Sequence, residues 1–227
     1  MKKRVCYSEM AYVLGMVFLA FGTALMEKGG FGMSVVVAPA YILHLKVSQF
    51  LPFFSFGMAE YVLQAVLIVL LSLVLQTFKK HYLFSFITAV IYGFLLDGMM
   101  KVVSFIPESF LIRICLYVAG FVICAIGVAF LFHTYIAPEA YELVVKEVAH
   151  EKKKEIGKVK TIYDLSSCFI SVLLSFLFFG LFRFEGVKTG TFICAVFNGW
   201  LIGKMGNLLE RMLDFKDGSD LRKYMDQ

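Results

Sequence analysis

Long apolar stretches dominate the pattern of hydrophobic and polar positions along the chain. Each is close in length to the roughly 20 residues that a helix needs to cross the ~30 Å hydrocarbon core of a bilayer. Most of them lack the polar positions at a 3.6-residue period that mark a surface helix of a soluble protein. We therefore predict an all-α integral membrane protein with six transmembrane helices, at 8–26, 55–77, 82–105, 109–134, 161–182 and 189–210.

One further apolar stretch, GGFGMSVVVAPAYILHL at 29–45, is interrupted by glycines and by Pro39. Its uninterrupted part is too short to cross a bilayer. Irregular backbone is tolerated at membrane depth where protein surrounds it. We predict a short re-entrant or interfacial helix after the first span, and a seventh, irregular span is the alternative.

The apolar stretches also repeat one another. YVLGMVFLAFGTA at 12–24 matches YVAGFVICAIGVA at 117–129 in seven of thirteen positions, at an offset of 105 residues. FITAVIYGFL at 86–95 matches FICAVFNGWL at 192–201 in six of ten positions, at an offset of 106. Between them, VLLSLVL matches VLLSFLF at an offset of 103. The common order of the three matches indicates an internal duplication.

Each copy of the duplication holds three spans. Because three is an odd number, the second copy crosses the bilayer in the opposite direction from the first, as in inverted-repeat transporters. We therefore predict a single membrane domain over 1–227, with repeat one at 8–106 and repeat two at 109–212.

Glycines keep their places in both copies. Small residues seven positions apart share a helix face and let membrane helices approach closely. We predict that these glycines pack the helices against one another; a solute path lined by glycine backbone is the alternative. They are Gly15, Gly22, Gly93, Gly120, Gly127 and Gly199.

Basic residues stand mostly at the ends of the apolar runs. The net charge is +5, and this placement is typical of membrane topology rather than of nucleic acid binding. With six spans, 15 Lys and Arg fall on one face and six on the other. The positive-inside bias predicts a multipass protein with both termini in the cytoplasm.

The longest polar stretch, at 138–160, is predicted to be a cytoplasmic connector. Its first part has the pattern of an amphipathic helix on the membrane surface, where its lysines contact anionic lipid or simply fix topology. The polar tail at 214–227 is predicted to be cytoplasmic and loosely ordered.

Motifs for catalysis are missing from the sequence. There is no G-x-S-x-G, H-E-x-x-H or Walker glycine loop, and the five cysteines form no C-x-x-C pair. We predict no enzyme, no cofactor and no metal site, and interpret the cysteines as small buried hydrophobes.

Polar residues within the spans are the candidates for a solute or ion path. A charge inside a span is expensive and marks a functional site by default. The repeat aligns Glu60 and Tyr61 with Tyr163 and Asp164, so each copy carries an acid–tyrosine pair near the start of its middle helix. The alternative is a carboxylate placed at a helix N-terminus, which the helix dipole favours.

Tyr92 and Asn198 occupy matching positions beside the paired glycines of the third and sixth spans. We place both on the same path, with an interhelical hydrogen bond as the alternative. His44 and Gln64 are further candidates, and Asp97 is spaced to pair with Lys101 along one helix.

The segment GTALMEKGGFGMS at 22–34 resembles the YitT/YczE-like family of bacterial multipass membrane proteins, which show a glycine-bearing first span, a Gly-rich turn and a short helix. Here the turn is followed by the apolar SVVVAPAYI, where the family pattern leads us to expect a polar or acidic residue. The family is largely uncharacterised, and the resemblance implies a plasma-membrane protein of transporter type.

These patterns together favour a small-solute transporter with a site near the repeat interface. The alternative is a substrate-binding or accessory membrane subunit that acts with a partner protein. The expected partners are the lipid bilayer, an unknown small solute, and either a second copy of the chain or another membrane protein, with no nucleic acid.

Overall fold

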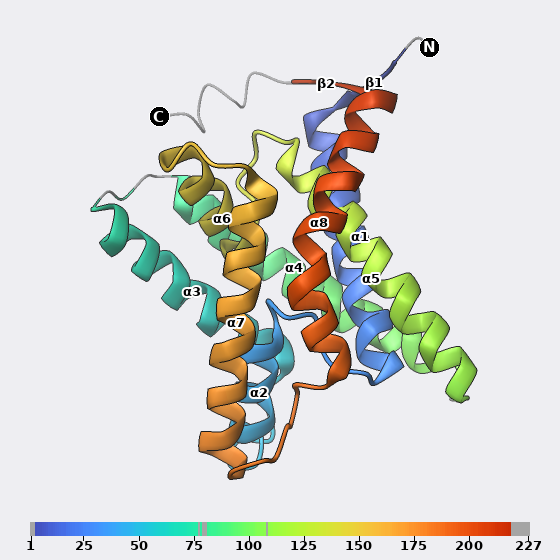
Figure 1. Ribbon diagram of the computed structural model, residues 1–227, viewed down its shortest axis with the longest axis vertical. Coiled ribbons are helices and arrows are strands. Elements are labelled where there is room, and N and C mark those ends of the chain that lie inside the picture. The colour runs from blue at the N-terminus through green and yellow to red at the C-terminus, as the bar shows by residue number, and fades with distance from the viewer. Residues whose placement is uncertain (1–2, 77, 79–80, 108, 219–227) are drawn as a thin grey trace.

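The computed structural model describes residues 3–76, 78, 81–107 and 109–218 and is almost wholly helical (Figure 1). Six of the described helices are long and apolar enough to cross a membrane, which confirms an all-α multipass membrane fold. The elements in chain order are β1 (Arg4–Tyr7), α1 (Ser8–Gly29), α2 (Ala38–Val47), α3 (Phe56–Leu75), α4 (His81–Ser104), α5 (Phe110–Phe132), α6 (Ala140–Glu151), α7 (Ile156–Phe179), α8 (Thr189–Met212) and β2 (Leu213–Lys216).

The outside of the bundle is covered by large apolar side chains. Leu73, Phe94 and Leu177 are each about 70% exposed or more. An apolar surface of this extent is unfavourable in water. These side chains therefore face lipid.

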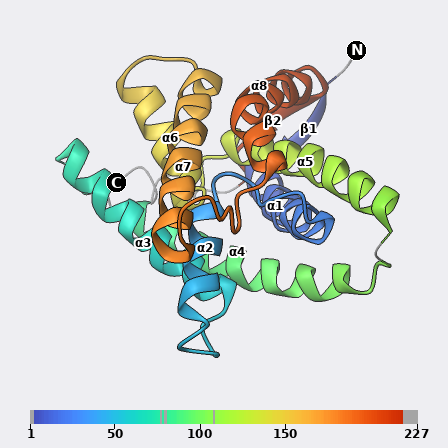
Figure 2. The ribbon, with the colours of Figure 1, turned by 60° about the horizontal axis from the view of Figure 1, so that its bottom comes forward.

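Two helices, α1 and α5, form the centre of the bundle and run antiparallel (Figures 1 and 2). A Cβ added to Gly22 would lie 2.7 Å from the carbonyl oxygen of Gly120, and one added to Gly120 would lie 2.6 Å from that of Gly22. Gly127 approaches the Gly15 carbonyl in the same way, at 2.8 Å. Only glycine lets the two backbones come this close.

The helices α4 and α8 flank this centre, α4 against α1 and α8 against α5. Tyr12 is hydrogen-bonded to Thr88 at 2.8 Å, and Tyr117 is hydrogen-bonded to the Cys194 thiol at 3.2 Å. The tyrosines are 105 positions apart and their partners 106 apart. The same contact therefore occurs twice, at the offset of the sequence repeat.

Two more of the repeated glycines join α4 to α3 and α8 to α7. A Cβ on Gly93 would meet the ring of Tyr61 at 2.5 Å, and one on Gly199 would meet the carbonyl oxygen of Gly157 at 2.7 Å. All six glycines thus lie at helix contacts.

The short helices α2 and α6 lie at opposite ends of the bundle (Figure 1). We call the end that holds β1, β2 and α6 the terminal face, and the end that holds α2 the opposite face. Ser167, the twelfth of 24 residues in α7, donates to the Val35 carbonyl ahead of α2 at 2.9 Å. Gln64, the ninth of 20 residues in α3, accepts from the Ala140 amide of α6 at 2.9 Å. Both short helices therefore begin at mid-depth of a span.

This depth decides two expectations. The segment 33–40 is buried throughout, so the Gly-rich stretch is re-entrant rather than interfacial. The first part of 138–160 differs from the expected surface helix, because Tyr141, Leu143 and Val145 are buried inside the bundle. Backbone at this depth is supported because neighbouring spans supply its hydrogen bonds.

A small parallel sheet joins the two ends of the chain, with Arg4 opposite Leu213 and Tyr7 opposite Lys216. Ser8 donates to Asp217 at 3.2 Å, and the Gly218 amide donates to Glu9 at 3.1 Å. Residues 214–218 are therefore fixed to the bundle, contrary to the expectation of a loose tail. The remainder of that tail, 219–227, and five of the basic residues counted for orientation lie outside the described residues; these five are Lys2, Lys79, Lys80, Arg222 and Lys223.

Candidate functional site

A cluster of buried polar side chains fills the space between α3, α6, α7 and α8. We call it the acidic cluster, because it contains four carboxyl groups and one ammonium group, each at most 2% exposed. Its members are Glu60, Gln64, Glu139, Tyr141, Glu142, Lys160, Asp164 and Asn198.

The part of the cluster on α3 is organised by Gln64. Its amide nitrogen lies 3.3 Å from Glu60 Oε2 and 3.2 Å from Glu139 Oε2, and it donates to both. The Tyr141 hydroxyl also donates to Glu60 Oε2, at 2.8 Å. Because the Gln64 carbonyl also accepts from Ala140, this one side chain fixes the start of α6 against α3.

The part on α7 is organised by Lys160. Its ammonium group donates to Glu142 Oε1 at 2.7 Å and lies 3.3 Å from Asp164 Oδ1. The Asn198 amide of α8 donates to the other Asp164 oxygen at 2.9 Å. Lys160 stands four residues before Asp164, so one face of α7 presents both groups to α6.

The start of α6 connects the two parts. Glu139 is its N-cap residue and Glu142 lies in its first turn, where the helix dipole favours negative charge. Burial raises the pKa of Glu139 well above its usual range, and the carboxyls of Glu60 and Glu142 raise it further. Gln64 and Lys160 oppose this rise in pKa, so Glu139 interacts with both parts of the cluster.

The cluster has more acid than base, and some of its oxygens lack hydrogen bonds. In the part of the chain that the structure describes, Glu60 Oε1 and Glu142 Oε2 have no hydrogen-bond partner, and Asp164 Oδ1 has only its ion-pair contact with Lys160. A buried charge without compensation is very costly, and such a group takes up a proton instead. Among the described residues no three acidic, His or Cys side chains are placed to hold a metal ion. Proton uptake by the carboxyl groups is a reaction that this arrangement can support.

Three of the four residues predicted for a solute or ion path lie in this cluster: Glu60, Asp164 and Asn198. The depth of Asp164 differs from the expectation, because α7 begins at Ile156 rather than at 161. Asp164 is therefore the ninth residue of its helix, while Glu60 is only the fifth residue of α3.

Tyr92 lies close enough to the cluster to interact electrostatically with Glu60 and Glu139, but its hydrogen bond goes to another helix. Its hydroxyl donates to Thr23 at 3.1 Å, which links α4 to α1 and matches the interhelical hydrogen bond considered as its alternative role. His44 is bonded to the Phe54 carbonyl at 2.8 Å beside α2, and Asp97 lies against Gly57 at the start of α3. None of these three side chains is hydrogen-bonded to the cluster within the part of the chain that the structure describes.

Sequence reasoning missed Glu139, Tyr141, Glu142 and Lys160, because they stand in the stretch taken for a polar surface connector. A signal for them was present in the repeat. At the offset of 105, Glu139 and Glu142 align with Ser34 and Val37, which belong to the re-entrant segment of the first copy. The same offset therefore predicts a re-entrant position for both acids.

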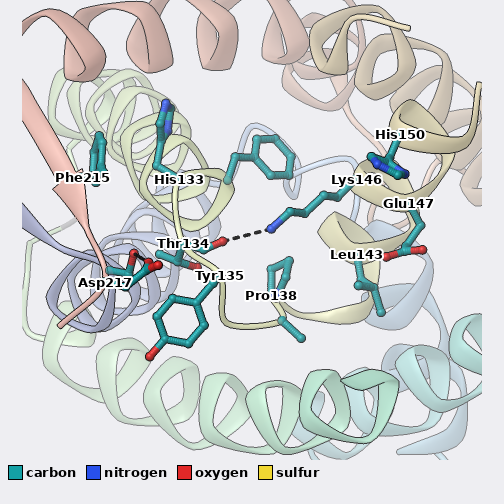
Figure 3. A pocket seen from close by; sticks show the side chains of 13 residues that line it. His133, Thr134, Tyr135, Pro138, Leu143, Lys146, Glu147, His150, Phe215 and Asp217 are labelled. Atoms are coloured by element: carbon teal, nitrogen blue, oxygen red, sulfur yellow. Dashed lines mark hydrogen bonds between the residues drawn. The ribbon is translucent and has the colours of Figure 1, made fainter. Parts of the chain in front are cut away.

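A cavity of about 560 Å³ opens on the terminal face next to the cluster (Figure 3). Pro138 and Leu143, which line it, are the chain neighbours of Glu139 and Glu142, so the start of α6 separates the cavity from the acids. Lys146 extends toward the Thr134 carbonyl and donates to it at 3.0 Å. His133, His150 and Asp217 add polar groups to a wall that also contains Phe132 and Phe215.

One family model matches residues 6–207, from β1 into α8, and the family is described as a Family of unknown function (DUF6198). No curated protein and no solved structure matches the chain.

Proposed function

We propose that this chain, which belongs to that family of unknown function, is a small-solute transporter whose acidic cluster binds the protons that drive transport. The observation that carries the proposal is the excess of buried carboxyl groups over ammonium groups at the point where α6 enters the bundle. Ionisable residues inside a membrane protein mark proton relays and solute paths.

Recurring contacts support two inverted repeats as the frame of this transporter. The tyrosine bonds of α4 and α8 recur at offsets of 105 and 106. Gln64 and Ser167, 103 apart, each hold the start of a short helix, at Ala140 and Val35, which are 105 apart. Because α1 and α5 run antiparallel, these matched contacts favour a pseudo-two-fold axis in the membrane plane.

The short helices support a site at the middle of the membrane. In inverted-repeat transporters the substrate and coupling ion bind near the midplane, at helices that cross only part of the bilayer. Both α2 and α6 begin at that depth. In this chain α6 brings two acids there, whereas the segment before α2 is apolar apart from Ser34. The proton site therefore forms at only one of the two short helices, α6.

The orientation follows from charge. We propose that the terminal face is cytoplasmic, because most of the described basic residues at the ends of the spans belong to that face. We propose the plasma membrane from the family resemblance of the segment 22–34. Lys160 leaves this set, because it is buried beside Glu142. The resemblance to the YitT/YczE-like family agrees with this placement and stays a prediction.

Charge movement in proteoliposomes tests the proposal. Purified protein on a solid-supported membrane is expected to give a transient current when the pH is stepped, because protons bind inside the membrane. Glu60→Gln combined with Asp164→Asn should remove the current. Glu155→Gln, at an exposed residue paired with Lys158, should leave it intact.

A wild-type current no larger than that of empty liposomes would contradict the proposal, as would an unchanged current in the double variant. With the current established, panels of small solutes are added to find one that enlarges it. A solute that the chain binds but never moves would favour the accessory subunit instead.

A further inference from the structure

A smaller cavity of about 210 Å³ lies at the opposite face, beside a more open pocket of about 470 Å³ that shares Gly30 and Lys188 with it. Six of its lining residues come from the end of α1, the Gly-rich turn and α2. Each of the six has its counterpart, 105 positions later, in the wall of the large cavity. They are Glu27, Gly30, Gly32, Met33, Tyr41 and Leu45.

The correspondence can be followed residue by residue. Tyr41 of α2 matches Lys146 of α6, and Leu45 matches His150. The hydrogen bonds beside the cavities match as well. Thr191 donates to the Met33 carbonyl at 3.0 Å, and Ser85, 106 positions earlier, donates to the Pro138 carbonyl at 2.6 Å. The two cavities are therefore the same structure formed twice, once at each end of the bundle.

The two cavities differ in what holds their loops. At the opposite face, the Lys188 ammonium group donates to the Gly30 carbonyl at 3.0 Å, and the Gly190 amide donates to the Phe31 carbonyl at 2.9 Å. These bonds fasten the Gly-rich turn to the start of α8. At the terminal face, the carbonyl of Ile136, which matches Phe31, accepts from Thr134 of its own loop at 3.2 Å. The loop at the terminal face is fastened as well, by Ser85 and Thr88 of α4 and by the bond from Tyr135 to Glu9. Among the described residues, bonds to loop carbonyls from the first residues of a flanking helix, Lys188 and Gly190, occur only at the smaller cavity.

We propose that the two cavities are the two mouths of one solute path, and that Lys188 is part of the gate that closes the mouth at the opposite face. The structure then has its path open toward the terminal face. Exchange of the two arrangements between the repeats would release the Gly-rich turn from α8, widen the small cavity and narrow the large one. This inference rests on the proposed transport function, and it adds where solute enters and which contacts alternate.

Cysteine accessibility from the two sides of the membrane tests the gate. In a background without the five native cysteines, Leu45→Cys reports on the small cavity and His150→Cys on the large one. A membrane-impermeant maleimide applied from either side measures each labelling rate. His150→Cys should react quickly from the terminal face, and Leu45→Cys slowly from the opposite face.

Opening the gate should change the labelling rates of Leu45→Cys and His150→Cys in opposite directions. Lys188→Met removes the bond to Gly30 and should raise labelling of Leu45→Cys about fivefold, because the loss of one solvent-exposed hydrogen bond shifts a two-state equilibrium by about that factor. Labelling of His150→Cys should fall when the other mouth opens. Lys101→Met, a lysine in the last turn of α4 that does not line the cavity, should change neither rate.

A rise at Leu45→Cys without a fall at His150→Cys would show local loosening of the turn and would overturn the gate. Equal rates in Lys188→Met and the parent would overturn it too. The labelling needs no proton binding and no known solute. A failed pH-step current with reciprocal labelling would therefore reject the proton site alone, and the converse would reject only the gate.

Discussion

Removing the ammonium group of Lys160 is expected to destabilise the protein strongly. Lys160→Met keeps the length and volume of the side chain but leaves Glu142 and Asp164, both at most 1% exposed, without their cation. Breaking a buried ion pair by deleting one partner costs roughly 3–5 kcal/mol, because the remaining charge is stranded. At roughly 2–4 °C per kcal/mol for a chain of this size, the melting temperature should fall by about 6–20 °C.

The assay is thermal unfolding of the detergent-purified variants, with two controls. Lys158→Met, two residues away, breaks an exposed pair with Glu155 at 3.1 Å and should cost less than about 1 kcal/mol. Lys160→Met combined with Glu142→Gln and Asp164→Asn removes the stranded charges and should recover most of the loss. Equal melting temperatures for the Lys160→Met and Lys158→Met proteins would refute the reasoning. A triple variant no more stable than Lys160→Met would refute it too.

Two further predictions concern Glu139 and the α1–α5 contact. Burial raises the pKa of Glu139 above its ordinary value of 4.5, so the folded state holds a proton that the unfolded state releases. Its stabilising contribution is therefore present below that value and lost as the pH rises toward the raised pKa. The melting temperature of the detergent-purified Glu139→Gln protein should fall less steeply from pH 5 to pH 8 than that of the wild type. An equal slope in the two proteins would contradict the raised pKa of Glu139. Gly22→Ala places a Cβ 2.7 Å from the Gly120 carbonyl oxygen and should lower stability by about 1–3 kcal/mol through overpacking. Gly98→Ala, where no atom lies within 4 Å, should be neutral or stabilise by up to about 1 kcal/mol, and equal losses at the two glycines in the same melting assay would show that close approach is not the cause.

Hydropathy predicted the spans because a lipid-facing helix must be apolar along most of its length. Five of the predicted helix starts lie within one residue of the observed starts; they are 8, 55, 82, 109 and 189. The start of α7 was missed by five residues. Its first turns carry Lys158 and Lys160, which look like the polar end of a loop. Lys160 is compatible with a buried helix because Glu142 and Asp164 neutralise it.

The acidic cluster was only half visible in the sequence. Glu60, Asp164 and Asn198 stood out because they interrupt apolar runs. Glu139 and Glu142 did not, because they stand among other polar residues. Their burial depends on a contact between Gln64 and Ala140, which are 76 positions apart. The local sequence shows that a segment is polar, but it does not show the distant side chain whose hydrogen bond allows the segment to be buried.

The pairing of β1 with β2 has a consequence for biosynthesis. Residues 4–7 leave the ribosome long before their partners at 213–216. Synthesis runs at roughly 5–20 residues per second, so the first strand waits about 10–40 seconds for its partner. Phe215 and Asp217 line the large cavity, so its wall is incomplete throughout that interval. A nascent chain therefore carries an open-sided cavity until residues 213–217 have been made and β2 has paired with β1.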